Sequence, residues 1–108
     1  MVVAFQPHLF SRTRDFADAF GAALALADVV FLAAVYPARE APLPGVSSAL
    51  IARAMQALGR RPAWQGERQA LAAALAAEAR AGDVVITLGA GDITRTGPEL
   101  LARLAGTT

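Results

Sequence analysis

Three short apolar runs, at residues 2–5, 29–35 and 84–88, constrain the fold of this chain more than any other feature. They are rich in β-branched and aromatic residues and lack the polar alternation of a strand that has one face in water. Strands of this kind are covered on both faces, as in a parallel sheet that lies between two layers of helices. The runs therefore predict the interior of an α/β domain.

Stretches with helical spacing separate these runs. Apolar residues recur on one face around 16–27, 50–58 and 68–81, and a short closing helix is expected over 98–104. A brief run at 62–64 takes the place of a further strand in this series. Alternating strands and helices imply right-handed βαβ units. We expect a three-layer α/β/α Rossmann-like fold with a mostly parallel sheet.

Several residues are typical of helix ends. Ser47 or Ser48 can cap the start of the second helix, and Gly59 marks its end. Thr96 and Glu99 have the spacing of a capping box, in which each side chain bonds a free backbone N–H of the first turn. These residues predict where the second and the last helix begin.

Composition limits the range of functions. A length of 108 residues fits one domain, and ten arginines, no lysine and nine carboxylates give a net charge of +1, so neither nucleic acid nor a membrane is an expected partner. The absence of cysteine excludes disulfides and thiolate chemistry, and a single histidine excludes a metal site made of several histidines. No signal peptide or membrane-spanning run is recognised. We expect a cytoplasmic protein.

Three loops follow the predicted strands, at 8–13, 36–40 and 89–92. Ligands of open parallel sheets bind outside the carboxyl ends of the strands. Because the strands are expected to be parallel, the three loops should meet at one edge of the sheet. The first loop also leads into a helix, whose free N–H groups and dipole favour an anion.

The first loop offers several candidate ligand-binding residues. His8, alone in its type, fits either a loop histidine bonded to backbone or a ligand contact. Arg12 is either a solvated residue of the first helical turn or a donor to a carboxylate or phosphate. The second alternative is favoured by the helix dipole, because a cation beside a helix N-terminus is unfavourable unless an anion sits there too. Ser11 and Thr13 are most simply explained as N-caps of the helix.

The other two loops add backbone and side-chain groups. The Gly89-Ala90-Gly91 stretch lets backbone N–H groups approach a ligand closely, although it is neither a dinucleotide fingerprint nor a phosphate loop, which needs a lysine. The polar residues Tyr36, Glu40 and Asp92 either solvate their loops or contribute to a site. No residue is singled out as catalytic.

With these residues in place, the chain resembles the C-terminal domain of the Mur ligases, in particular those that join L-alanine to UDP-N-acetylmuramate. Three blocks of sequence carry the resemblance: Phe5-Gln6-Pro7-His8 with Ser11-Arg12-Thr13-Arg14-Asp15, Val35-Tyr36-Pro37-Ala38 with Glu40, and Gly89-Ala90-Gly91-Asp92-Ile93. The chain departs from the family pattern at Leu9, Phe10 and Arg39. Arg39 stands in place of a glycine, and arginine resists a positive φ there.

The resemblance implies that residues 1–108 are the amino-acid-seating domain of an ATP- and Mg²⁺-dependent ligase of peptidoglycan synthesis. In such enzymes ATP phosphorylates the lactyl carboxylate of UDP-N-acetylmuramate, and the amine of L-alanine attacks the acyl phosphate. An N-terminal domain holds the UDP-sugar and a central domain holds ATP, so the chain alone is expected to bind no cofactor and to be inactive. The first strand of the full family domain is expected to be missing here, which would leave an uncovered edge and a monomer or a weak self-associate.

The resemblance also implies roles for individual residues. Arg12 corresponds to the arginine that contacts the carboxylate of alanine, and His8 to the histidine beside it. Residues 89–91 correspond to a loop that lines the same pocket.

Two other readings remain open from the residues themselves. The chain could be a stand-alone module that binds a small anionic metabolite at the start of the first helix. It could also be a structural domain that binds an apolar partner surface and no small ligand.

Overall fold

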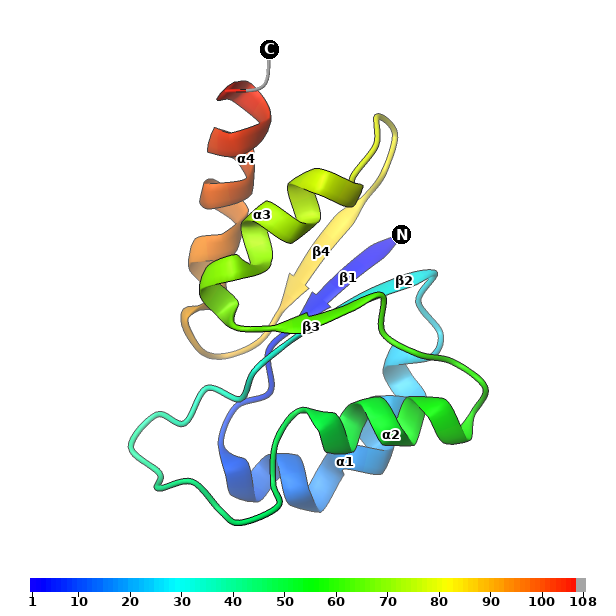
Figure 1. Cartoon of the computed structure of the whole chain (residues 1–108), viewed down its shortest axis with the longest axis vertical. Helices are drawn as coiled ribbons and strands as arrows, with labels where there is room; N and C mark the ends of the chain where they lie inside the picture. The colour runs from blue at the N-terminus through cyan, green and yellow to red at the C-terminus, as the bar shows by residue number, and fades with distance from the viewer. Residues whose placement is uncertain (107–108) are drawn as a thin grey trace.

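A computed structural model describes residues 1–106 as a single parallel sheet between two pairs of helices (Figure 1). The strand order is β3-β2-β1-β4, and each neighbouring pair is parallel. The strands are β1 (Val2–Phe5), β2 (Val29–Ala33), β3 (Trp64–Gly66) and β4 (Val85–Leu88). The helices are α1 (Phe10–Leu24), α2 (Ala49–Ala57), α3 (Arg68–Glu78) and α4 (Thr96–Gly106), with a 3₁₀ turn η1 (Asp92–Arg95) before the last.

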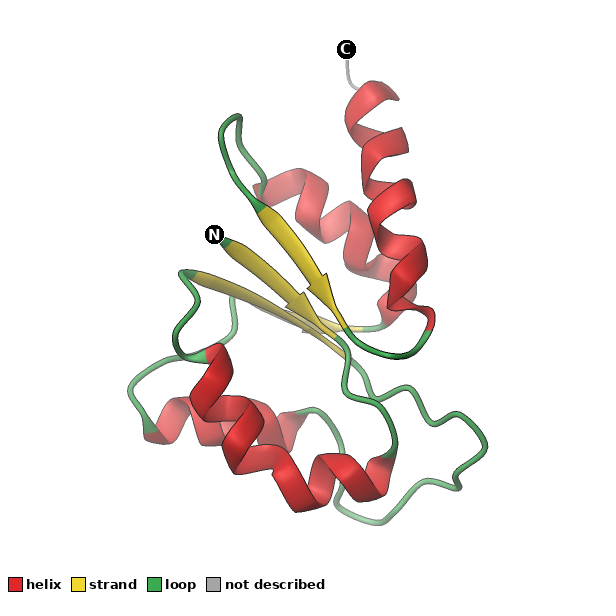
Figure 2. Ribbon diagram, turned by 180° about the vertical axis from the view of Figure 1, so that it is seen from behind, coloured by secondary structure: helices red, strands yellow, loops and turns green. Residues whose placement is uncertain are grey.

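The three-layer α/β/α fold predicted from the sequence is therefore confirmed. Helices α1 and α2 cover one face of the sheet, and α3 and α4 cover the other (Figure 2). The brief run at 62–64 does lead into a strand, since Trp64 pairs with Phe31 in β2. In residues 1–106 no helix is both long enough and apolar enough to cross a membrane.

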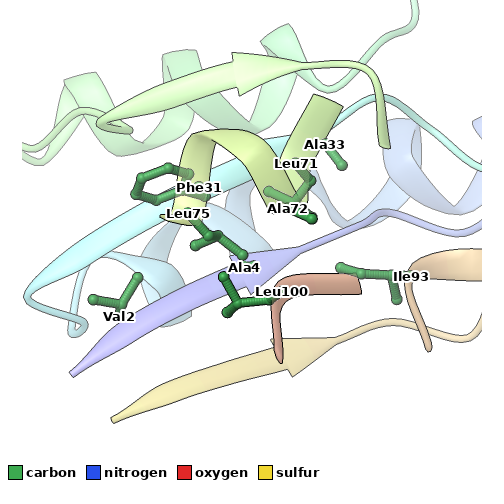
Figure 3. Close-up of a cluster of buried hydrophobic side chains, with 9 residues drawn as sticks. All are labelled: Val2, Ala4, Phe31, Ala33, Leu71, Ala72, Leu75, Ile93 and Leu100. Carbon is green, nitrogen blue, oxygen red and sulfur yellow. The ribbon is translucent and has the colours of Figure 1, made fainter. Parts of the chain in front are cut away.

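Two hydrophobic clusters, one on each face of the sheet, hold the layers together. Val3, Val30 and Leu32 point toward α1 and α2, whereas Ala4 and Phe31 point toward α3 and α4. Figure 3 shows the cluster to which Ala4 and Phe31 belong. Its labelled side chains are Val2, Ala4, Phe31, Ala33, Leu71, Ala72, Leu75, Ile93 and Leu100. Full burial of one leucine or phenylalanine side chain contributes about 1.5–3 kcal/mol. Helices cover both faces of the sheet, which explains why the strands are apolar along their whole length.

Helices α1 and α2 touch at a glycine. A Cβ on Gly21 would lie 2.5 Å from the Cβ of Ala54 and 3.1 Å from the backbone nitrogen of Met55. Only the absence of a side chain at Gly21 lets the two helices approach this closely. A side chain at Gly21 would therefore push α1 and α2 apart.

Strand β4 forms an edge of the sheet. It pairs with β1 alone, and its apolar residues Ile86 and Leu88 are exposed, as is Val84 just before it. An open sheet has two edges in any case, so the absence of the family's first strand stays a prediction.

The predicted N-caps at Ser11 and Thr13 are wrong, whereas the predictions of a serine at the start of α2 and of Gly59 at its end are confirmed. Ser11 and Thr13 are not N-caps, because α1 already begins at Phe10 and the N-cap position is Leu9, which has a φ of 69°. For α2, Ser47 rather than Ser48 accepts a hydrogen bond from the Ala49 N–H at 3.2 Å. Gly59 follows the end of α2 with a φ of 76°, the left-handed conformation expected there.

The capping box at the last helix does not form. Helix α4 begins at Thr96 directly from η1, so its first turn is not a free end. The Thr96 hydroxyl is buried without a hydrogen-bond partner, and Glu99 pairs with Arg68 instead. A contact from another helix has replaced the local one.

Candidate functional site

The loops after β1, β2 and β4 meet at the carboxyl edge of the sheet, as the sequence predicts. Beyond the strands, His8 and Tyr36 form one further parallel bridge, in which the Leu9 N–H donates to the Tyr36 carbonyl at 2.9 Å. The His8 and Tyr36 rings stack with centroids 5.8 Å apart and an angle of 16° between their planes. A Cβ on Gly91 would lie 2.4 Å from Cγ of Tyr36, so the third loop reaches the same point.

The start of α1 is closed by a carboxylate from the second loop. Glu40 Oε1 accepts a hydrogen bond from the Ser11 backbone N–H at 2.9 Å, and Oε2 accepts one from the Ser11 hydroxyl at 2.6 Å. These hydrogen bonds, the side-chain one first, lower the pKa of Glu40 below its ordinary value. The helix start does attract an anion, and the protein supplies that anion itself.

The remaining residues of the first turn differ in exposure. Thr13 is fully buried, and its hydroxyl donates to the Leu9 carbonyl at 2.8 Å. Arg12 is exposed, and no ion pair or side-chain hydrogen bond within residues 1–106 involves it. Its guanidinium therefore keeps all its donors for an external group, while Glu40 relieves the cost of a cation beside the helix N-terminus.

Packing explains the glycines of the third loop. Gly89 has a φ of 154°, and a Cβ there would lie 2.9 Å from the Gln6 carbonyl oxygen. Gly91 faces the Tyr36 ring and the Gln6 side chain. Ala90, between them, is exposed. The two glycines let this loop pack against the other two, with Ala90 at the surface.

Arg39 does not take up the positive φ that a glycine in its place would readily accept. The positive φ in that loop is at Ala38, with a value of 54°, and Arg39 is not among the residues with positive φ. The arginine therefore avoids the conformation that glycine alone accepts readily.

A partly buried polar network lies behind these loops, and of its members only Asp92 was a candidate from the sequence. Gln6 donates to Asp92 Oδ1 at 2.9 Å and accepts from the Ile93 N–H at 3.0 Å. Arg68, 8% exposed, places its Nε 3.3 Å from Asp92 Oδ2 and pairs with Glu99 through Nη1. Arg68 follows β3, which has the weakest sequence signal of the four strands. With β3 placed in the same parallel sheet, the loop after it would have been a fourth candidate loop at this edge, and it leads to Arg68.

This network borders a pocket of about 240 Å³. Its lining includes Gln6, Tyr36, Arg68 and Asp92, so it lies next to the junction of the three loops. Among residues 1–106 there is no group of three histidine, cysteine or acidic side chains able to hold a metal ion. The chain also lacks the lysine that a phosphate loop requires.

The fold and the three converging blocks define a Mur ligase domain. Residues 1–91 match the family described as Mur ligase, glutamate ligase domain, and the chain belongs to this family.

The individual proteins that are similar to this chain share one name. The chain is 54% identical over 106 residues to the UDP-N-acetylmuramate--L-alanine ligase of Cutibacterium acnes, an alignment that covers 98% of this chain and 22% of that protein. It is 54% identical over 105 residues to the enzyme of the same name from Kineococcus radiotolerans, covering 97% and 22% of the two chains. It is 48% identical over 105 residues to the enzyme of the same name from Streptomyces coelicolor, an alignment that covers 97% of this chain and 23% of that protein. The chain thus spans about a fifth of the length of these relatives.

Proposed function

We propose that residues 1–108 form the C-terminal, amino-acid-seating domain of an ATP-dependent ligase that joins L-alanine to the lactyl carboxylate of UDP-N-acetylmuramate. The names of the similar proteins support this assignment, and so does the alignment of nearly the whole chain to only about a fifth of each. ATP and Mg²⁺ are then bound mainly by the other two domains, as the resemblance to the family implies, and the chain holds no lysine for a phosphate loop. The whole enzyme would work in the cytoplasm, in peptidoglycan synthesis.

The observation that carries the proposal is the exposed and unpaired Arg12 guanidinium in the first turn of α1, a helix that begins at the edge where the three loops meet. In the proposed role it binds the carboxylate of L-alanine, with His8 beside it. A planar fork of donors suits a carboxylate, because two parallel hydrogen bonds fix its orientation. The alanine amine then attacks the acyl carbon of the phosphorylated substrate, phosphate leaves, and the nitrogen loses a proton.

The other candidate residues have supporting roles in this proposal. Ser11 and Glu40 fix the start of α1, on which Arg12 lies, and Thr13 ties the same turn to Leu9. Tyr36 and residues 89–91 shape the wall of the alanine pocket, and Asp92 anchors that wall. Closure of the domain over the acyl phosphate would keep water from hydrolysing it.

Steady-state phosphate release tests the proposal. The full-length protein, given ATP, Mg²⁺, UDP-N-acetylmuramate and L-alanine, is expected to release phosphate only when all four are present. The 108-residue chain under the same conditions is expected to release none. Robust turnover by the 108 residues alone would contradict the assignment to one domain of a three-domain enzyme.

A stand-alone module for small anionic metabolites is less well supported. It places the anion at the start of α1, where Glu40 already bonds the Ser11 N–H and hydroxyl. Calorimetry of the isolated chain with phosphate, nucleotides and amino acids separates the two functions. Saturable binding of one of these anions, without any other domain, would favour the module.

A further inference from the structure

We propose that Arg68 is a positioning residue for the incoming amino acid, acting through Asp92 on the loop of residues 89–92. The inference rests on the proposed function, because it gives a role in seating alanine to a residue that lines the pocket next to the junction of the three loops. Arg68 is the first residue of α3 and lies outside the three blocks that carry the family resemblance.

The contacts of Arg68 join separate parts of the carboxyl edge. Its Nε lies 3.3 Å from Asp92 Oδ2, and its Nη1 bonds Glu99 in α4. The Nε–H is buried and makes no hydrogen bond, so it interacts with Asp92 as a charge. The guanidinium thus holds η1 and α4 against the start of α3.

Asp92 transmits this contact to the glycine loop. The other carboxylate oxygen of Asp92 accepts a hydrogen bond from the Gln6 amide at 2.9 Å, and Gln6 accepts the Ile93 N–H at 3.0 Å. Gly91 directly precedes Asp92 and packs against Tyr36 and the Gln6 side chain. Asp92 is therefore held from both sides, by Gln6 on the β1 side and by Arg68 on the α3 side.

The charges of the network predict the effect of removing Arg68. One guanidinium lies between two carboxylates, whose side chains are 26% exposed in Asp92 and 41% exposed in Glu99. Without Arg68 both carboxylates can turn toward water, so neither is left buried and unpaired. The loop then keeps only its Gln6 anchor, and the wall of the pocket shifts while the hydrophobic layers stay packed.

Kinetics of the full-length ligase test this role, with L-alanine, ATP and UDP-N-acetylmuramate each varied in turn. For Arg68→Met we expect the KM for L-alanine to rise about tenfold, with the other two KM values and the kcat at saturating alanine within about threefold of wild type, since uniform binding of one substrate is lost. Arg68→Lys keeps the charge without the fork of donors, so we expect it to recover part of the alanine KM. Arg53→Met, which removes an exposed arginine from α2 on the other face of the sheet, is the matched control and is expected to leave all three KM values unchanged.

A double variant asks whether Arg68 acts through Asp92. Asp92→Asn should also raise the KM for L-alanine, and Arg68→Met with Asp92→Asn should be no worse than the worse single variant. Additive effects would refute transmission through Asp92, and equal rises in all three KM values would reduce Arg68 to a structural role. If Arg68→Met does not fold, Asp92→Asn alone decides, because an unchanged alanine KM there overturns the inference.

The outcomes also separate this inference from the function on which it rests. A wild-type enzyme without alanine-dependent phosphate release refutes the proposed function, and the inference with it. An active wild type together with an Arg68→Met variant of normal alanine KM refutes the inference alone.

Discussion

Replacement of Gly91 by alanine should destabilise the domain, because the third loop packs there without room for a side chain. The new Cβ would lie 2.4 Å from Cγ and 2.7 Å from Cδ1 of Tyr36, and 2.8 Å from Oε1 of Gln6. The first distance is about 1 Å inside ordinary van der Waals contact. Cγ is the root of the ring, so Tyr36 cannot yield by a small turn of its side chain.

The expected magnitude is a balance of two effects. Overpacking a well-packed site costs about 1–3 kcal/mol. Alanine also restricts the unfolded chain, which offsets this cost by at most about 0.4–1 kcal/mol. The free energy of unfolding should fall by about 1–2 kcal/mol, and each kcal/mol lost should lower the Tm by about 4–8 °C.

Thermal and urea unfolding of the 108-residue chain measure this loss. Gly106→Ala is the matched control, because a Cβ there meets nothing within 4 Å, so only the effect on the unfolded chain remains and the Tm should stay unchanged or rise slightly. Tyr36→Ala removes the two closest contacts, so its combination with Gly91→Ala should lose less than the sum of the single variants, by about 1 kcal/mol. A Gly91→Ala variant as stable as Gly106→Ala would refute the packing explanation of this glycine.

Three further predictions concern other parts of the domain. Gly21→Ala should lower the stability by about 1 kcal/mol net in urea unfolding, because overpacking against Ala54 outweighs the gain in helix propensity, and an increase in Tm would show that α1 and α2 can separate without cost. The pKa of Glu40 is lowered in the folded state, so the stability that its carboxylate gives the fold is complete above the ordinary pKa of 4.5 and is lost as the pH falls through the folded-state pKa. The difference in unfolding free energy between wild type and Glu40→Gln should therefore shrink with acidification. A difference that stays constant from about pH 7 to about pH 3 would contradict this assignment. In the full-length ligase, Arg12→Ala should lower kcat/KM for L-alanine by the equivalent of about 1.5–3 kcal/mol, with Arg53→Ala as control, and unchanged kinetics would remove Arg12 from the site.

The arrangement of the three blocks could be read from the sequence because it follows from general rules. Apolar runs without alternation identify strands covered on both faces, and connections through helices make them parallel. Parallel strands place His8, Tyr36 and Gly91 at one edge whatever the details of the loops, and the structure has them in contact there. The binding roles of these residues stay predictions.

Local rules failed where a distant residue competed for the same group. Ser11 and Thr13 have the chemistry of N-caps, yet the carboxylate that bonds the start of α1 comes from Glu40, 29 residues away. Likewise Glu99 has the spacing of a capping box and pairs with Arg68, which is 31 residues away. A charged partner brought close by the fold makes a stronger hydrogen bond than a neutral local cap.

The sequence by itself therefore determined the layers, the direction of the strands and the edge at which the loops meet, because hydrophobic periodicity and chain handedness act over short stretches. Only the tertiary structure decided which polar groups pair at that edge. Gln6 and Asp92 are 86 residues apart in the chain, and their hydrogen bond exists only because β4 lies next to β1. Such pairs depend on strand order and loop packing, and neither leaves a periodic pattern in the residues that form them.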